Sequence, residues 1–175
     1  PDQGGFHEGL ADVVALLSVF AVPVVLEHAL AEVAPTGAIS QGEATRRTLE
    51  KSVLFQIAEE FGEAVHGRAD RPLRNSLERL TPGGGWRRDP EYIRVHDRGE
   101  VLVASVARAL LDMWLGRLTI LLEDGPVPRR LAAEEGAKAA EHLLKMVIRA
   151  IDYCPPLEFE YEDFLDAILW SDEQV

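Results

Sequence analysis

The chain has 175 residues, of which 47% are hydrophobic and 27% are charged, values typical of one globular domain rather than of a disordered or collagen-like chain. Its 30 acidic and 18 basic residues give a formal net charge of −12, which argues against binding to nucleic acid or to an anionic membrane surface. The single cysteine, Cys154, excludes an internal disulfide and is compatible with a reducing compartment such as the cytoplasm.

Apolar residues recur with a helical period through most of the chain, so we predict an all-α fold: a single compact domain of about six to seven helices. A first helix is expected over about 6–21, and a second over about 23–34, with a proline in its first turn. Ser40 with Glu43 three residues later has the capping-box pattern. We therefore expect a third helix to start there and to end at Gly67.

The rest of the chain is expected to be organised around one buried helix. A short helix after Asp70 leads into a glycine-rich loop over about 81–94. The following helix, over about 95–123, is apolar except for a narrow polar stripe, so we predict that it is the buried centre of the domain. Helices over about 129–153 and 161–170 complete the chain.

Two carboxylates stand out on the first predicted helix. Glu8 and Asp12 lie four residues apart, on one side of a helix that is otherwise apolar. Zinc accepts a carboxylate oxygen, and a second carboxylate can orient a ligand, so this pair is a candidate metal-binding element. A solvated helix end, where the dipole favours acidic residues, explains it as well. The segment begins like the zinc motif HExxH, but Ala11 stands where its second histidine belongs.

Three further polar residues are candidates for chemistry. His96 follows the glycine-rich loop, five residues after Glu91, at the start of the predicted buried helix. A histidine in this place can donate a hydrogen bond to an oxyanion while a carboxylate orients it, but a surface histidine without a chemical role is the alternative. Arg74 can bind a carbonyl or carboxylate, or it can form an exposed ion pair with Glu78.

Taken in order, these segments resemble the C-terminal helical half of thermolysin-like zinc metallopeptidases of the gluzincin class, whose third-ligand segment reads close to HEAFADIVAL. That segment here reads His7-Glu8-Gly9-Leu10-Ala11-Asp12-Val13-Val14-Ala15-Leu16. The resemblance continues through residues 58–62, 72–74, 91–99 and 148–156, with Phe164-Leu165 after them, so it spans nearly the whole chain.

The resemblance implies a zinc-dependent peptidase that acts on a peptide or protein substrate. Glu8 would be the third zinc ligand and Asp12 the carboxylate that supports it. His96 would stabilise the oxyanion, with Glu91 orienting it, and Arg74 would bind the substrate carbonyl. HExxH, which supplies two ligands and the general base in the family, is missing from these residues, so this chain alone cannot assemble the catalytic site.

We therefore expect residues 1–175 to be the C-terminal part of a longer protein, or to be complemented by a separate chain that carries HExxH. The chain departs from the family pattern in two more places besides the missing HExxH. Gly9 replaces a helix-favouring residue, which costs up to about 1 kcal/mol of local helix stability, and Glu91 stands where aspartate is expected.

The alternative function is a non-catalytic helical interaction module whose acidic surface binds a basic partner. Without the missing half, an apolar face would be exposed, and we expect self-association.

Overall fold

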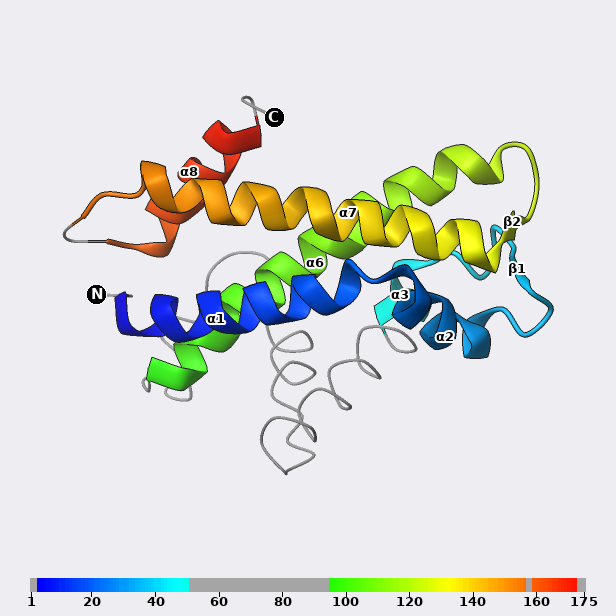
Figure 1. The fold of residues 1–175 in the computed structure, drawn as a ribbon, viewed down its shortest axis with the longest axis horizontal. Coiled ribbons are helices and arrows are strands. Elements are labelled where there is room, and N and C mark those ends of the chain that lie inside the picture. The colour runs from blue at the N-terminus through cyan, green and yellow to red at the C-terminus, as the bar shows by residue number, and fades with distance from the viewer. Residues whose placement is uncertain (1–2, 51–94, 157–158, 173–175) are drawn as a thin grey trace.

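The computed structural model of the protein describes residues 3–50, 95–156 and 159–172, and this part of the chain is all-α, as predicted. Predictions for residues 51–94, including the helix end at Gly67, the short helix and the glycine-rich loop, lie outside the described residues. In chain order the elements are α1 (Gln3–Phe20), α2 (Pro23–Val33), β1 (Ala38–Ile39), α3 (Arg46–Leu49), α6 (Val95–Leu122), β2 (Val127–Pro128), α7 (Arg129–Ala150), the 3₁₀ helix η4 (Ile151–Tyr153) and α8 (Tyr161–Asp172) (Figure 1).

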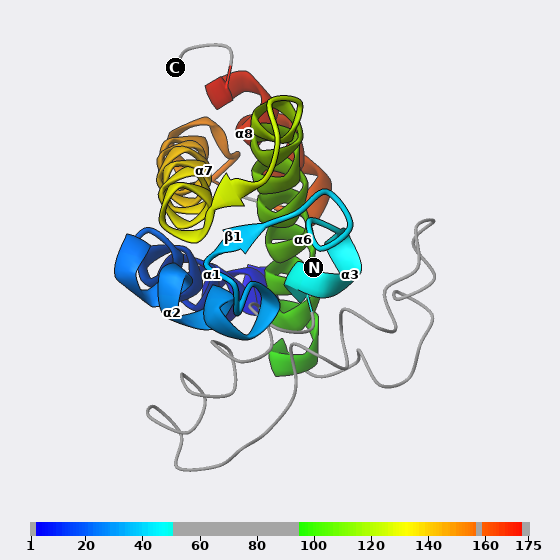
Figure 2. The same ribbon diagram turned by 90° about the vertical axis from the view of Figure 1, so that its right-hand side faces the viewer.

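The helix α6 is the buried centre of the fold, as its apolar pattern predicted. The helices α1, α2 and α7 form a layer, and α6 crosses one face of this layer obliquely (Figures 1 and 2). Along α6, Leu110, Trp114 and Leu118 have no exposed surface, and Ser105 and Asp112 lie on its exposed side. The helix therefore directs most of its apolar side chains into the layer and keeps polar residues on its outer side, although Ile120 near its end is exposed.

The helix α7 holds the described elements together because it contacts α1, α2, α6 and α8. Its small residues let α6 approach closely. A Cβ at Gly136 would lie 2.5 Å from the ring of Trp114, and the indole Nε1 donates a hydrogen bond to the carbonyl of Ala132 at 2.9 Å. The largest buried side chain of the core is thus fixed in position by α7.

A short antiparallel strand pair, which the sequence analysis did not predict, ties two connections together. Ala38 is opposite Pro128 and Ile39 is opposite Val127. Gly37, with a φ of 87°, turns the chain out of the end of α2. Two residues per strand are too few to show an alternating pattern, so hydrophobic periodicity could not reveal this pair.

The third helix starts later than the capping-box pattern predicted. Glu43 accepts hydrogen bonds from the backbone N–H of Ser40 at 2.8 Å and from its hydroxyl at 2.6 Å, but these residues close a turn. The helix α3 begins at Arg46, where Thr45 caps it by accepting a hydrogen bond from the backbone N–H of Thr48. The prediction that a helix starts at Ser40 was therefore wrong, because the Glu43 carboxylate makes these hydrogen bonds across a turn rather than at a helix start.

The other helix ends agree with prediction to within a few residues. The helix expected over 129–153 ends at Ala150 and continues as the 3₁₀ turn η4, and the last helix extends to Asp172.

In the described part of the chain, no single helix is long and apolar enough to cross a membrane. Only α1 and α2 taken together reach that length and apolarity, and they are bent by 78° where they meet.

Candidate functional site

The two carboxylates of α1 lie on one side of the helix, as predicted, but in different environments. Glu8 is half-buried, and its Oε2 atom is withdrawn from solvent. Asp12, one turn further along, is exposed. A carboxylate oxygen that is held away from water is suited to bind a cation or a donor group, whereas an exposed carboxylate is already solvated. Glu8 is therefore the stronger ligand candidate of the two.

Next to Glu8, the backbones of α1 and α6 touch. A Cβ built at Gly9 would lie 2.7 Å from the carbonyl oxygen of Gly99 and 2.9 Å from its Cα. A Cβ at Gly99 would in turn lie 3.0 Å from the backbone nitrogen of Gly9 and 3.1 Å from the carbonyl oxygen of Gly5. A side chain at Gly9 would force the α6 backbone to move, and one at Gly99 would be crowded, so the close crossing explains why glycine stands inside α1 at position 9.

The crossing also brings together two predicted site positions. His96 precedes Gly99 by three residues on α6, which is about one helical turn, and Glu8 is adjacent to Gly9 on α1. The helical turns that carry these two positions therefore flank the contact between Gly9 and Gly99. The side chain of His96 lies outside the described part of the structure.

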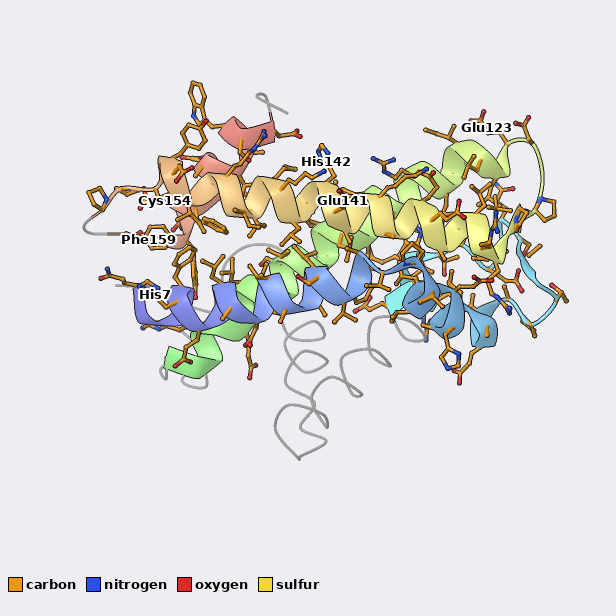
Figure 3. All side chains as sticks on the ribbon, in the orientation of Figure 1. His7, Glu123, Glu141, His142, Cys154 and Phe159 are labelled. Carbon is orange, nitrogen blue, oxygen red and sulfur yellow. The ribbon has the colours of Figure 1, made fainter. Side chains whose placement is uncertain are left out.

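A set of buried aromatic residues supports this end of the molecule. The ring of Phe6 lies 4.3 Å from that of Phe159 and 4.8 Å from that of Phe164, measured between centroids. The hydroxyl of Tyr161 donates a hydrogen bond to the carbonyl of Arg98 at 2.7 Å. The first turns of α1, α6 and α8 are thus joined within a few residues of Glu8, and Figure 3 shows Phe159 close to the start of α1. Such packing restricts how the Glu8 turn can move.

The remaining members of the predicted site, Arg74 and Glu91, lie outside the described residues. Among the residues that are described, no group of three or more histidine, cysteine, aspartate and glutamate side chains could hold a metal ion. Of the predicted site residues, the described segments thus offer the half-buried carboxylate of Glu8, which is chemically suitable as a single zinc ligand, and the remaining ligands would have to come from other residues.

The hydroxyl and thiol groups of Ser18, Ser105 and Cys154 have local structural surroundings rather than those of nucleophiles. The hydroxyls of Ser18 and Ser105 donate to carbonyl oxygens one turn earlier in their own helices, at 2.7 and 2.8 Å. Burial, with the Asp163 carboxylate as the smaller cause, raises the pKa of the Cys154 thiol. A raised pKa lowers the fraction of thiolate, so this cysteine is a poor nucleophile.

Sequence reasoning missed the residues that support the site. The glycine crossing joins positions ninety residues apart, and no local pattern pairs Gly9 with Gly99. The signal that was available is Gly9 itself, a glycine inside a predicted helix, which costs helix stability and so indicates a packing reason. The aromatic residues before and in α8 also carry no local signature of a contact with α1.

Comparison with known proteins adds no relative: no protein-family model matches the chain, and neither a curated protein nor a solved structure matches it. A functional assignment therefore depends on the residues at the α1–α6 crossing and on the family resemblance of the segments that carry them.

Proposed function

We propose that this chain is the helical part of a gluzincin-type zinc metallopeptidase, in which Glu8 provides one zinc ligand to a site completed by an HExxH segment from elsewhere. The observation that carries this proposal is the close crossing of α1 and α6 at Gly9 and Gly99, because the half-buried Glu8 is next to one glycine and His96 stands one turn before the other. A solvated helix end, the alternative interpretation of the acidic pair, does not account for the buried Oε2 atom of Glu8.

In this proposal each residue of the chain has a separate task. Glu8 offers its carboxylate at the metal, and the fixed helix crossing holds it in place. Zinc in such a site lowers the pKa of a bound water and polarises the peptide carbonyl. His96 donates a hydrogen bond to the carbonyl oxygen as negative charge develops on it, Glu91 orients His96, and Arg74 binds a carbonyl of the substrate chain.

Asp12 supports this arrangement from one turn further along α1. Its carboxylate is exposed in the described structure, and an aspartate in this place can orient a group from the completing segment, such as a metal-bound histidine. Loss of a carboxylate with this role lowers metal affinity by about 10–100-fold in zinc proteins. Asp12→Asn should therefore weaken zinc binding without abolishing it.

The test is zinc analysis of the full-length natural protein and of two matched variants. Glu8→Gln removes the charge of the ligand with little change in shape, and Glu32→Gln makes the same change at an exposed position on α2. We expect one zinc per molecule in the wild type and in Glu32→Gln, and loss of zinc and of casein hydrolysis in Glu8→Gln. Thermal unfolding establishes that both variants are folded.

Two results would overturn the proposal. If Glu8→Gln keeps its zinc, then Glu8 is not a ligand, whatever happens to activity. If the full-length wild-type protein binds no zinc and does not hydrolyse peptides, then the chain is better described as a helical interaction module that shares the peptidase architecture.

A further inference from the structure

The helix α8 lies at the end of the described structure opposite the β1–β2 pair (Figure 1), and its outward side carries exposed apolar side chains. Leu165, Leu169 and Trp170 are 57%, 58% and 62% exposed, although they lie on a well-packed helix. Tryptophan is enriched at protein interfaces, and exposed apolar residues that form one patch mark interaction sites. A surface helix with nothing to bind would be expected to carry polar residues here.

Helical geometry places these apolar residues on one face together with two acidic ones. With about 100° between successive residues, Glu162, Leu165, Asp166, Leu169 and Trp170 fall within an arc of about 140°. All five are exposed. Phe164, Ala167 and Ser171 lie on the opposite side and are the buried residues of the helix. We call the five exposed residues the outer face of α8.

The outer face is held in place by contacts at both ends of the helix. Near its end, the hydroxyl of Ser171 donates a hydrogen bond to the carbonyl of Met146 on α7 at 3.1 Å, and Asp172 lies 3.2 Å from His142 Nε2. Near its start, Phe164 packs on the ring of Phe6. The face is therefore preformed, and a partner would not have to order it, which favours binding.

Charge determines which partner fits. Residues 150–175 contain eight of the acidic residues of the chain and no lysine, arginine or histidine. A second copy of this chain would bring the same negative charge to the contact, and an anionic lipid surface would also be repelled. A segment with both apolar and basic side chains would match the exposed leucines and the negative charge of this end of the chain at once.

We propose that the outer face of α8 docks a cationic amphipathic segment of a partner protein. Leu165, Leu169 and Trp170 bury against the apolar side of that segment, and Glu162 and Asp166 attract its lysine and arginine residues. This inference does not depend on the zinc site, because the outer face of α8 lies on the side of the helix turned away from Phe164 and its contact with α1.

The probe is a synthetic amphipathic peptide of leucine and lysine, labelled for fluorescence anisotropy and titrated with the 175-residue protein. A peptide of the same composition in scrambled order tests whether apolar residues must share a face. Trp170→Ser removes the main apolar contact, and Ile120→Ser, at a 68% exposed position on α6, is its control. Asp166→Lys reverses one charge, and Glu123→Lys is its control at the far end of α6 (Figure 3).

We expect saturable binding that Trp170→Ser weakens by about tenfold or more. Asp166→Lys should weaken it by a smaller factor that shrinks as salt is added. Both controls should stay within about twofold of the wild type, and thermal unfolding should show all variants folded.

Several results would overturn the inference. Absence of saturable binding, equal binding of the scrambled peptide, or equal weakening by Ile120→Ser would each show that the outer face does not select the peptide. A wild-type dimer that Trp170→Ser dissociates would identify a second copy as the occupant. Binding to phosphatidylserine vesicles that Trp170→Ser abolishes would identify a lipid surface.

Discussion

Replacing Gly9 by alanine tests the helix crossing on which the candidate site depends. The added Cβ would lie 2.7 Å from the carbonyl oxygen of Gly99 and 2.9 Å from its Cα, well inside van der Waals contact. Both are backbone atoms of α6, so no side-chain rotation can relieve the overlap. The helices α1 and α6 must separate locally, and the buried residues along their interface lose contact.

The size of the effect follows from two opposing contributions. Alanine in the interior of a helix is favoured over glycine by about 1 kcal/mol. Overpacking of a close-packed interior costs about 1–3 kcal/mol, and the rigid backbone neighbour places this site at the upper end. We expect Gly9→Ala to lower the free energy of unfolding by about 1–2 kcal/mol, which is roughly 2–8 °C in Tm for a chain of this length.

Gly116→Ala is the matched control, because Gly116 is an exposed glycine inside α6 and an added methyl group there would meet no atom within 4 Å. There the helix propensity acts alone, so the same substitution should stabilise the protein by up to about 1 kcal/mol. Urea unfolding followed by circular dichroism measures both variants. Should Gly9→Ala be as stable as Gly116→Ala, the close approach of α1 and α6 is refuted.

Three other predictions concern the interface of α6 and α7. Gly136→Ala places a methyl group 2.5 Å from the buried ring of Trp114 and should lower the free energy of unfolding by about 1–3 kcal/mol in urea titrations. Trp114→Phe removes the hydrogen bond to the Ala132 carbonyl and part of the ring, so calorimetry should show a loss of about 1–3 kcal/mol. The hydrogen bond from Lys138 lowers the pKa of Glu135 below its usual 4.5, so its stabilising contribution is present above that pH and is lost as the pH falls through the lowered pKa. The free energy of unfolding of Glu135→Gln should therefore fall less than that of the wild type between pH 5 and pH 3. Measuring Tm at several pH values across this range, about two pH units, checks the prediction.

Local sequence patterns predicted most of the described fold because helices are local structures. Apolar spacing identified α6 as the buried centre, and Pro23 marked the first turn of α2. The capping-box pattern at Ser40 misled because the same hydrogen bonds close a turn. The strand pair between β1 and β2 joins residues about ninety positions apart, which no local pattern can reveal.

The candidate site was predictable only in part for the same reason. The spacing of Glu8 and Asp12 fixed their shared side of α1, but it could not decide which carboxylate is withdrawn from solvent. That difference depends on tertiary packing around the first turns of α1, which the spacing of two residues does not contain. Where the structure departs from local helix propensity, at Gly9, it does so to allow the contact with Gly99.

The central claim, that Glu8 binds zinc, is tested most directly by anomalous diffraction at the zinc edge from crystals of the full-length protein. We predict one strong zinc peak about 2.0–2.2 Å from a carboxylate oxygen of Glu8. A zinc peak elsewhere in the protein, or no peak in crystals grown with zinc present, would contradict the account.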